Sequence, residues 1–288
     1  MTALSSANAA LRALLSERPE AAPWLALYDL VLEEAANPVW VAAAAATRLA
    51  PERAPGAPLL TEAVIPLDAA ALDDWLRRLC AVAAEAGPEA ASLATATAAT
   101  GFDPPALLAA AIAGDPDELA AQAIRLGVDP AVLSTVLALA SMPLLRALRA
   151  QWGGAVPGDW HAGACPCCGA WATIAEHRGL ERARRLRCSR CGADWGLPTF
   201  VCAFCGETDH QRLGALIPEG AGESRRVETC DTCRGYLKAL ATLRAWSPAD
   251  IPLADLGSME LDMAALERDF ARPEAPAAPM PVRIVATS

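Results

Sequence analysis

The sequence predicts a mainly α fold, in which a multi-helix N-terminal domain precedes two tandem four-cysteine modules and a closing C-terminal helix. Hydrophobic residues make up 54% of the 288 residues but aromatic residues only 5%, so most of the apolar content is alanine and leucine. These residues favour helices over strands. Nine of the ten cysteines lie between Cys165 and Cys233, where the helix signals fade.

Four segments follow from these signals. We expect an all-helical domain over residues 1–156, two tandem metal-binding modules over 157–240, a helical segment over 241–271 and a flexible tail over 272–288. The first boundary falls in a glycine-rich stretch that suits a linker. The tail is rich in proline and alanine, a composition typical of mobile chain ends.

Apolar residues recur at helical spacing in the first half of the chain. A first helix precedes Pro23, and Pro23 and Pro38 open the next two. The stretch 51–58 contains three prolines and a glycine and is predicted to be a loop. Asp68 begins a further helix that ends before Gly87.

Three further helix starts share one dipeptide. An aspartate carboxylate can accept the free N–H groups of a first helical turn, and a proline in that turn has no N–H to leave unpaired. The pairs are Asp103-Pro104, Asp115-Pro116 and Asp129-Pro130. We therefore expect three successive helices, the last of which runs to about Gln151.

Short strand-like pieces are expected within the cysteine-rich region, over residues 173–177, 185–188 and 195–201. Helix is expected to return at 235–238 and again at 253–270, where apolar residues are spaced as on one helical face.

Four Cys-x-x-Cys motifs carry the chemistry of the chain. Two intervening residues allow one tight turn to present both sulfurs to the same ion, and a glycine after the second cysteine supplies the positive φ that such a turn needs. Two turns complete a tetrahedron of four sulfurs, so four turns predict two metal sites. The ligands are Cys165, Cys168, Cys188, Cys191, Cys202, Cys205, Cys230 and Cys233.

The four motifs can be joined into two sites in three ways. Sequential joining closes the shortest loops and is modestly favoured, and a hairpin between the two turns of each site would give rubredoxin-like or zinc-ribbon-like modules. Four thiolates accept either zinc or a single iron. Zinc would be purely structural, whereas iron could exchange an electron; the spacing does not distinguish them.

The other candidate ligands have simpler interpretations. Cys80 reads as a small buried hydrophobe in an apolar helix, and Cys167 as a surplus thiol inside the first turn. His161, His177 and His210 are not needed, because eight cysteines already satisfy two ions. No catalytic set of residues stands out, so we expect a metal-binding protein and not an enzyme.

The charge balance argues against nucleic acid as a partner. The chain carries a net charge of −10, which repels phosphates. An arginine cluster between the first two motifs keeps a nucleic-acid-binding ribbon protein open as a weaker alternative, although such a cluster in acidic surroundings suits a protein partner better. Its members are Arg178, Arg182, Arg184, Arg185, Arg187 and Arg190.

A cytoplasmic protein without membrane insertion is expected. The first residues lack a basic stretch followed by a long apolar core, and no apolar run reaches the ~18 uninterrupted residues of a membrane span. Clustered cysteines in a reducing compartment usually bind metal. The sequence leaves the oligomeric state open, with a homodimer as one option.

The order of the motifs resembles the family of formate dehydrogenase accessory proteins, FdhE. The resemblance rests on a helical first half, a CPxCG-type first motif, a second motif preceded by Arg-Leu-Arg and followed by Trp195, a third motif, and the stretch ETCDTCRGYLK over 228–238. The stretch 255–262 is similar to the family's closing helix. The resemblance is strong from about residue 160 to 265.

Membership would imply a cytoplasmic maturation factor for respiratory molybdenum formate dehydrogenase, which contacts the catalytic subunit before export and holds iron through the same eight cysteines. An alternative is a redox-active, rubredoxin-like iron protein that delivers electrons or sulfur to its client during maturation.

Overall fold

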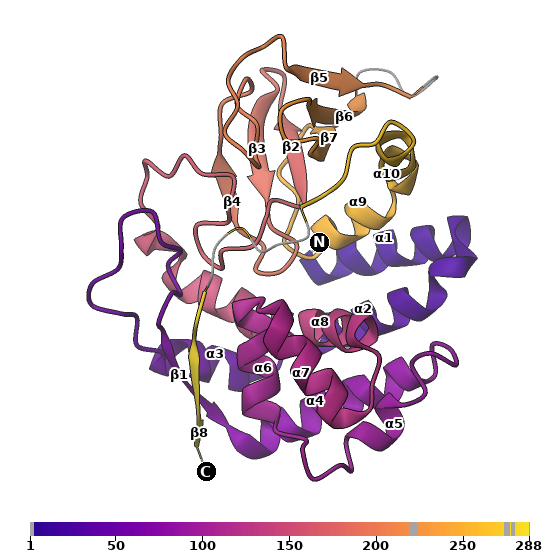
Figure 1. The fold of residues 1–288 in the computed structure, drawn as a ribbon, viewed down its shortest axis with the longest axis vertical. Helices are drawn as coiled ribbons and strands as arrows, with labels where there is room; N and C mark the ends of the chain where they lie inside the picture. The colour runs from indigo at the N-terminus through magenta and orange to yellow at the C-terminus, as the bar shows by residue number, and fades with distance from the viewer. Residues whose placement is uncertain (1–2, 219–223, 274–276, 278–279, 288) are drawn as a thin grey trace.

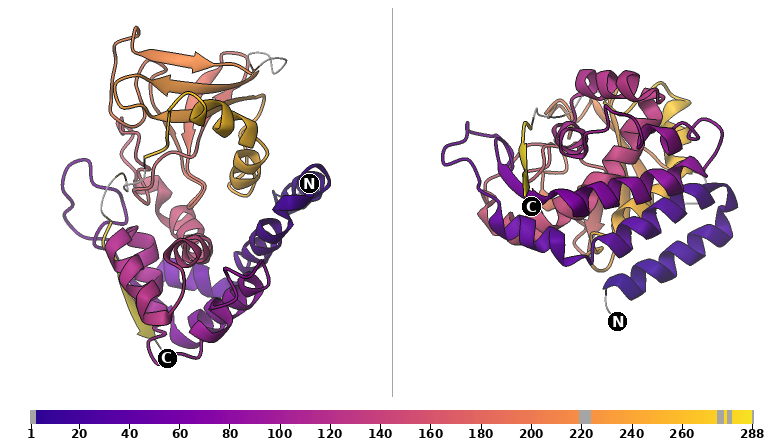
Figure 2. Two further views of the ribbon diagram at one scale, coloured as in Figure 1. Left: turned by 45° about the vertical axis from the view of Figure 1, so that its right-hand side comes forward. Right: turned by 90° about the horizontal axis from the view of Figure 1, so that it is seen from below.

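The computed structural model describes residues 3–218, 224–273, 277 and 280–287, with side chains described from residue 9 onward. A layer of helices forms one half of the molecule and a twisted sheet with two covering helices forms the other (Figure 1). Figure 2 shows that the helical layer opens like a V beneath the sheet.

Most of the helices lie between residue 3 and residue 155. Their bounds are α1 (Ala3–Glu17), α2 (Ala22–Glu34), α3 (Pro38–Ala46), α4 (Ala69–Ala84), α5 (Leu93–Ala96), α6 (Pro104–Ala113), α7 (Pro116–Leu126) and α8 (Pro130–Trp152), with the short 3₁₀ turns η1 (Pro19–Ala21) and η2 (Gly153–Ala155).

The three Asp-Pro helix starts are confirmed. The side chain of Asp103 accepts a hydrogen bond from the backbone of the first turn of α6, and Asp115 and Asp129 each accept two in α7 and α8. Helices α6 and α7 end at glycines with positive φ, Gly114 and Gly127, where a side chain would be strained. The local sequence therefore sets these helix ends.

Helix α8 is the central helix of this layer and packs against α2, α3, α4, α6 and α7. Within the described residues, one helix is long and apolar enough to cross a membrane by length and composition alone, over Pro130–Ala155. Its most apolar window is 61% buried inside the fold, which is typical of a core helix.

A six-stranded sheet carries all four cysteine motifs. Its strands are β2 (Ile174–Arg178), β3 (Ala183–Arg187), β4 (Asp194–Gly196), β5 (Leu213–Leu216), β6 (Arg225–Cys230) and β7 (Tyr236–Thr242), in the order β4-β3-β2-β7-β6-β5. Neighbouring strands are antiparallel except at the seam between β2 and β7, which is parallel.

The two modules repeat one another within this sheet. Each has a cysteine turn, two strands, a second cysteine turn and a third strand, and each contributes its three strands in the same spatial order. The repeats are therefore related by a shift along the sheet, and the seam joins the first strand of one module to the third strand of the other.

The mainly α fold with a closing C-terminal helix is wrong. The structure is 43% helix and 17% strand, and its described residues form two sheets. The expected helix over 253–270 is two short helices, α9 (Asp250–Leu256) and α10 (Met259–Leu266), which break at Gly257 and Ser258 and pack on one face of the large sheet.

The last element among the described residues is a strand and not a helix. Strand β8 (Arg283–Thr287) pairs in parallel with β1 (Val64–Asp68), a strand that the sequence analysis missed, so this part of the predicted flexible tail is ordered. Both strands are rich in the β-branched residues that favour strands. Residues 274–276, 278–279 and 288 of the predicted tail lie outside the described residues.

The helix expected at 235–238 is also wrong, because these residues enter strand β7. The run Tyr-Leu-Lys-Ala-Leu-Ala-Thr has helix-forming alanine and leucine, but β7 pairs on both sides, with β2 and with β6. Tertiary pairing at the centre of a sheet overrides weak local preference. A single core cluster joins this sheet to the helices, so the two layers share their hydrophobic interior.

Candidate metal centres

The structure gathers the eight predicted cysteines into two groups of four. Within each group all four Sγ atoms lie within 4.8 Å of one another, and the motifs are joined sequentially. We call them the proximal site, which touches the helical layer, and the distal site. The proximal site holds Cys165, Cys168, Cys188 and Cys191, and the distal site holds Cys202, Cys205, Cys230 and Cys233.

All four cysteine turns share one backbone hydrogen bond. The N–H of the first cysteine donates to the carbonyl five residues later, at 2.7 Å in the turn from Cys165 and 3.1 Å in that from Cys188. The corresponding bonds of Cys202 and Cys230 measure 2.9 and 3.0 Å. This common turn directs both sulfurs of each motif to one point.

The fourth turn departs from the other three. Gly169, Gly192 and Gly206 follow the second cysteine at positive φ, as predicted, but Arg234 occupies that position with φ 56°. Its guanidinium lies 3.9 Å from the ring centroid of Phe270 and donates to the carbonyl of Arg268 at 2.6 Å. These contacts offset the strain of a side chain in the left-handed region.

The donor sets fit a tetrahedral metal ion. Sulfur pairs lie 3.5 Å apart in the proximal site, between Cys165 and Cys191 and between Cys168 and Cys188, and 3.7 Å apart in the distal site. A regular tetrahedron with metal–sulfur distances of ~2.3 Å places sulfurs about 3.8 Å apart. Each group could therefore hold zinc or iron, and the distances do not distinguish the two.

The two sites differ sharply in their exposure to solvent. The proximal cysteines are 0–1% exposed and belong to the main core, whereas Cys205 and Cys233 of the distal site are exposed. The carbonyls of Pro166 and Cys167 accept hydrogen bonds from Leu59 and Leu60 of the helical layer, at 2.8 and 3.1 Å. The proximal site is thus part of the contact between the layers, and the distal site faces solvent.

Burial makes Cys165 of the proximal site and Cys202 of the distal site poor acids, whereas hydrogen bonds from neighbouring thiols lower the pKa of Cys188. Burial raises the pKa of Cys165 well above its usual value and that of Cys202 to about 11. Without a cation these two thiols stay protonated at neutral pH, and a bound metal would supply the charge that stabilises thiolates.

The remaining thiols and histidines lie outside both groups. Cys80 is 2% exposed in α4, and burial raises its pKa to about 11, as suits a small core residue. Cys167 is fully buried within the proximal turn. His161 and His210 are exposed, and His177 forms a hydrogen bond with Glu228 at 2.8 Å.

Most arginines of the cluster form ion pairs with acidic residues of the same sheet. Arg178 and Arg187 both bind Glu176, which is completely buried, and Arg178 and Arg185 bind Asp194 at 2.5 Å. Although burial opposes ionisation of Glu176, hydrogen bonds from the two arginines and Thr242 hold its pKa below the usual value.

Two further members of the cluster also point inward. Arg184 donates to Glu228 at 2.7 Å, and Arg190 donates to the carbonyl of Ala111 in α6 at 2.6 Å. These two side chains support the sheet and its junction with the helices, and so they are not free to contact phosphates.

Lys238 is a structural residue that the sequence analysis missed. It is the single lysine of the chain and is 1% exposed in the central strand β7. Its Nζ lies 2.6 Å from Asp255 Oδ1 and 2.7 Å from Asp262 Oδ2, and Arg272 binds the same two carboxylates. This cluster holds α9 and α10 on the sheet. The position of Lys238 within an apolar run was the signal in the sequence that could have revealed its structural role.

Comparisons with known proteins agree with the resemblance predicted from the motifs. Residues 200–277 match the family model described as FdhE, C-terminal domain. A protein of Stutzerimonas stutzeri named Protein FdhE homolog is 36% identical over 111 residues, which are 38% of this chain and 35% of that protein. A Pseudomonas aeruginosa protein of the same name is 32% identical over 152 residues, 48% of this chain and 49% of that protein.

These alignments span between about a third and a half of the length of the curated relatives. Over 97% of both chains, the fold resembles the crystal structure of the FdhE protein from Pseudomonas aeruginosa, with a TM-score of 0.61 and 22% sequence identity. The predicted resemblance is thus confirmed by sequence over residues 200–277, and the structural match shows a shared fold over nearly the whole chain.

Proposed function

We propose that this chain, whose residues 200–277 are an FdhE C-terminal domain, is an accessory protein in the maturation of a respiratory molybdenum formate dehydrogenase. In this proposal it is not the dehydrogenase itself. It binds the catalytic subunit in the cytoplasm before export, and its eight cysteines hold two metal ions. The domain match carries the proposal.

The site chemistry is consistent with an accessory role. The two groups of four cysteines use all four Cys-x-x-Cys motifs. Four sulfurs complete the coordination of one ion in each group, which leaves no open position for a substrate. Catalytic metal sites normally keep such a position. The sites therefore suit a scaffold that presents a surface to a client better than they suit hydrolytic or Lewis-acid chemistry.

Deletion and capture test this proposal. A strain that lacks the protein should lose formate dehydrogenase activity, and the chain supplied on a plasmid should restore it. Tagged chain should capture the catalytic subunit from cytoplasmic extract. Normal activity in the deletion strain would contradict the accessory role.

The exposure of the distal site favours one alternative. If iron occupies this site, Cys205 and Cys233 bring it within reach of a client, to which ferrous iron would pass one electron and become ferric. Metal analysis and visible absorption of anaerobically purified protein test this version. Two equivalents of colourless zinc would rule out electron transfer and leave the accessory role intact.

A further inference from the structure

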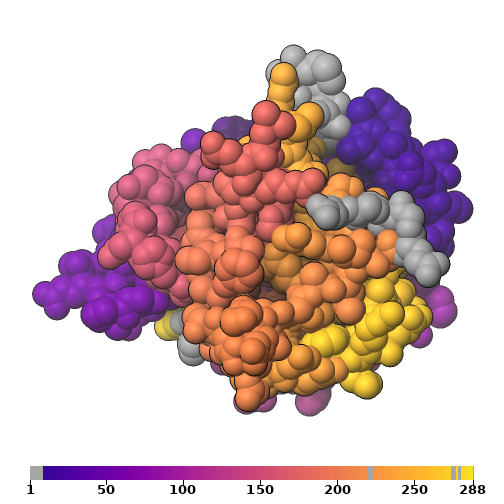
Figure 3. Space-filling view, turned by 90° about the horizontal axis from the view of Figure 1, so that it is seen from above, coloured from indigo at the N-terminus to yellow at the C-terminus, as the bar shows by residue number. Residues whose placement is uncertain are grey.

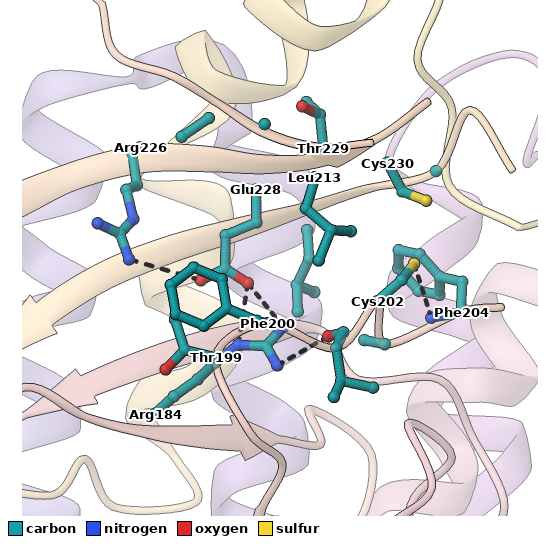
Figure 4. A pocket seen from close by; sticks show the side chains of 16 residues that line it. Arg184, Thr199, Phe200, Cys202, Phe204, Leu213, Arg226, Glu228, Thr229 and Cys230 are labelled. Carbon is teal, nitrogen blue, oxygen red and sulfur yellow. Dashed lines mark hydrogen bonds and ion pairs between the residues drawn. The ribbon is translucent and has the colours of Figure 1, made fainter. Parts of the chain in front are cut away.

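A hollow beside the distal site is not used by the metal chemistry. It has a volume of 330 Å³ and opens between the loop that carries Phe200 and strands β5, β6 and β7 (Figure 4). Leu213, Ala215 and Leu237 give it an apolar floor, and Cys202 and Cys230 lie at one end. This volume is at the lower limit of small-molecule pockets and suits one large side chain.

The opposite end of the hollow carries two arginines, Arg184 and Arg226, that share Glu228 as their counterion. Arg184 is satisfied there, because its Nε and Nη2 donate to Glu228 at 3.0 and 2.7 Å and its Nη1 donates to two carbonyls. Arg226 is held more loosely, because its Nη2 makes a long ion pair with Glu228, at 3.8 Å, and lies 3.2 Å from His177 Nε2. With its side chain 26% exposed, Arg226 can accept a carboxylate from outside.

The hollow adjoins a free sheet edge. Strand β5 pairs only with β6, and no other strand of the described residues lies on its outer side. Figures 1 and 2 place β5 at the rim of the molecule, and Figure 3 shows the second module, in orange, on the outer face of the sheet half. Two large apolar side chains are exposed nearby, Phe200 at 67% and Ile217 at 51%.

We propose that an extended segment of a partner protein adds to β5 as a seventh strand. A large apolar side chain of this segment fills the hollow over Leu213 and Ala215, beneath Phe200, and an aspartate or glutamate binds Arg226. Because alternate residues of a strand share a face, the two side chains are two positions apart. The inference rests on the proposed function only in that the natural partner is a protein client.

The charge of the hollow argues for this occupant. Its lining holds two arginines and one glutamate, whereas the whole chain carries a net charge of −10. A bound metal with its four thiolates would add negative charge beside Cys202 and Cys230, so an acidic side chain is attracted to the Arg226 end of the hollow, away from the cysteines. Main-chain hydrogen bonds to β5 would supply affinity, and the hollow with its arginine would supply specificity.

Selection from a library of random short peptides on the purified, metal-loaded full chain tests the proposal. Enriched peptides should contain a large apolar residue two positions from an aspartate or glutamate. In fluorescence anisotropy with a labelled synthetic copy, R226Q and F200A should each weaken binding about tenfold. The matched controls R268Q and L180A, which alter an exposed arginine and an exposed leucine elsewhere, should bind like the parent chain.

The charge contact has its own test. Replacing the acidic residue of the peptide by its amide should weaken binding to the parent chain by a similar factor but should have little further effect on R226Q. Unchanged binding of R226Q and F200A, no enriched pattern, or peptides that copy this chain's own sequence would overturn the proposal. Circular dichroism and metal content show whether each variant is folded.

Capture of the catalytic subunit separates this inference from the proposed function. If the R226Q/F200A double variant captures the subunit as well as the parent chain does, the inference fails and the accessory role stands. If the parent chain binds the selected peptides through the hollow but captures no catalytic subunit, the peptide site stands and the proposed client is wrong.

Discussion

Metal should leave the two sites at very different rates. Cys205 and Cys233 expose the distal site, whereas all four proximal sulfurs are 0–1% exposed. A chelator can attack the distal metal directly, but it reaches the proximal metal only after the turn from Cys165 to Cys168 has separated from the helical layer. The second release should therefore be limited by a local opening of the protein.

The structure gives the size of this difference. Opening breaks the hydrogen bonds from Leu59 and Leu60 to the turn, which cost about 1 kcal/mol each. It also exposes both leucine side chains, now 2% and 0% accessible, at about 1.5 kcal/mol or more each. The total of about 5 kcal/mol corresponds to a rate ratio on the order of 10³ or larger.

The assay is metal transfer to a chromogenic chelator in excess, followed by absorbance at neutral pH. Fully loaded protein should release its metal in two phases of equal amplitude. C205S should lack the fast phase and keep the slow one, because the substitution removes a ligand of the distal site alone. A single phase that releases both ions, or loss of the slow phase in C205S, would contradict a local opening that protects the proximal metal.

Three further outcomes are expected. K238M should lower the free energy of unfolding by about 1.5–3 kcal/mol, because Asp255 and Asp262 lose the hydrogen bonds of the buried ammonium and keep only Arg272 as a cation; urea denaturation measures the change. E176Q should reduce the loss of stability at acid pH. The pKa of Glu176 is lowered in the folded protein, so the carboxylate stabilises the fold above its unfolded pKa near 4.5, and this stabilisation is lost as the pH falls through the folded pKa. The melting temperature, measured at several pH values, should therefore fall less steeply in the variant. Duplex DNA should bind no more tightly than about 10⁻⁴ M in a gel-shift assay at low salt, because the arginine cluster is engaged internally; steeply salt-dependent binding would contradict this.

The elements that sequence reasoning predicted well are those governed by neighbours in the chain. An aspartate accepts the N–H groups of the next few residues, so Asp115 and Asp129 mark helix starts with no knowledge of the fold. The Cys-x-x-Cys turns are equally local, because one hydrogen bond across five residues shapes each of them. The two groups of four cysteines could therefore be predicted to the residue, and loop closure favoured the observed joining.

The elements that could not be predicted depend on distant partners. Strand β1 has its partner β8 more than two hundred residues away, and β7 is a strand only because β2 and β6 flank it. A short apolar run such as that of β7 has no periodicity that separates strand from helix. The internal ion pairs of the arginine cluster could not be predicted for the same reason, because Glu176 and Glu228 become its partners only in the assembled sheet.

The seam between the modules also has a consequence for how the chain is made. Strand β2 leaves the ribosome with an unpaired inner edge, and its partner β7 follows roughly 60 residues later, which at about 5–20 residues per second is a delay of several seconds. Throughout that interval the first module presents an open strand edge, the kind of surface on which nascent chains aggregate. If the four cysteines of the proximal site bind an ion early, the metal would hold the hairpin β2–β3 together until β7 is synthesised. The availability of metal during synthesis should therefore affect the yield of folded protein.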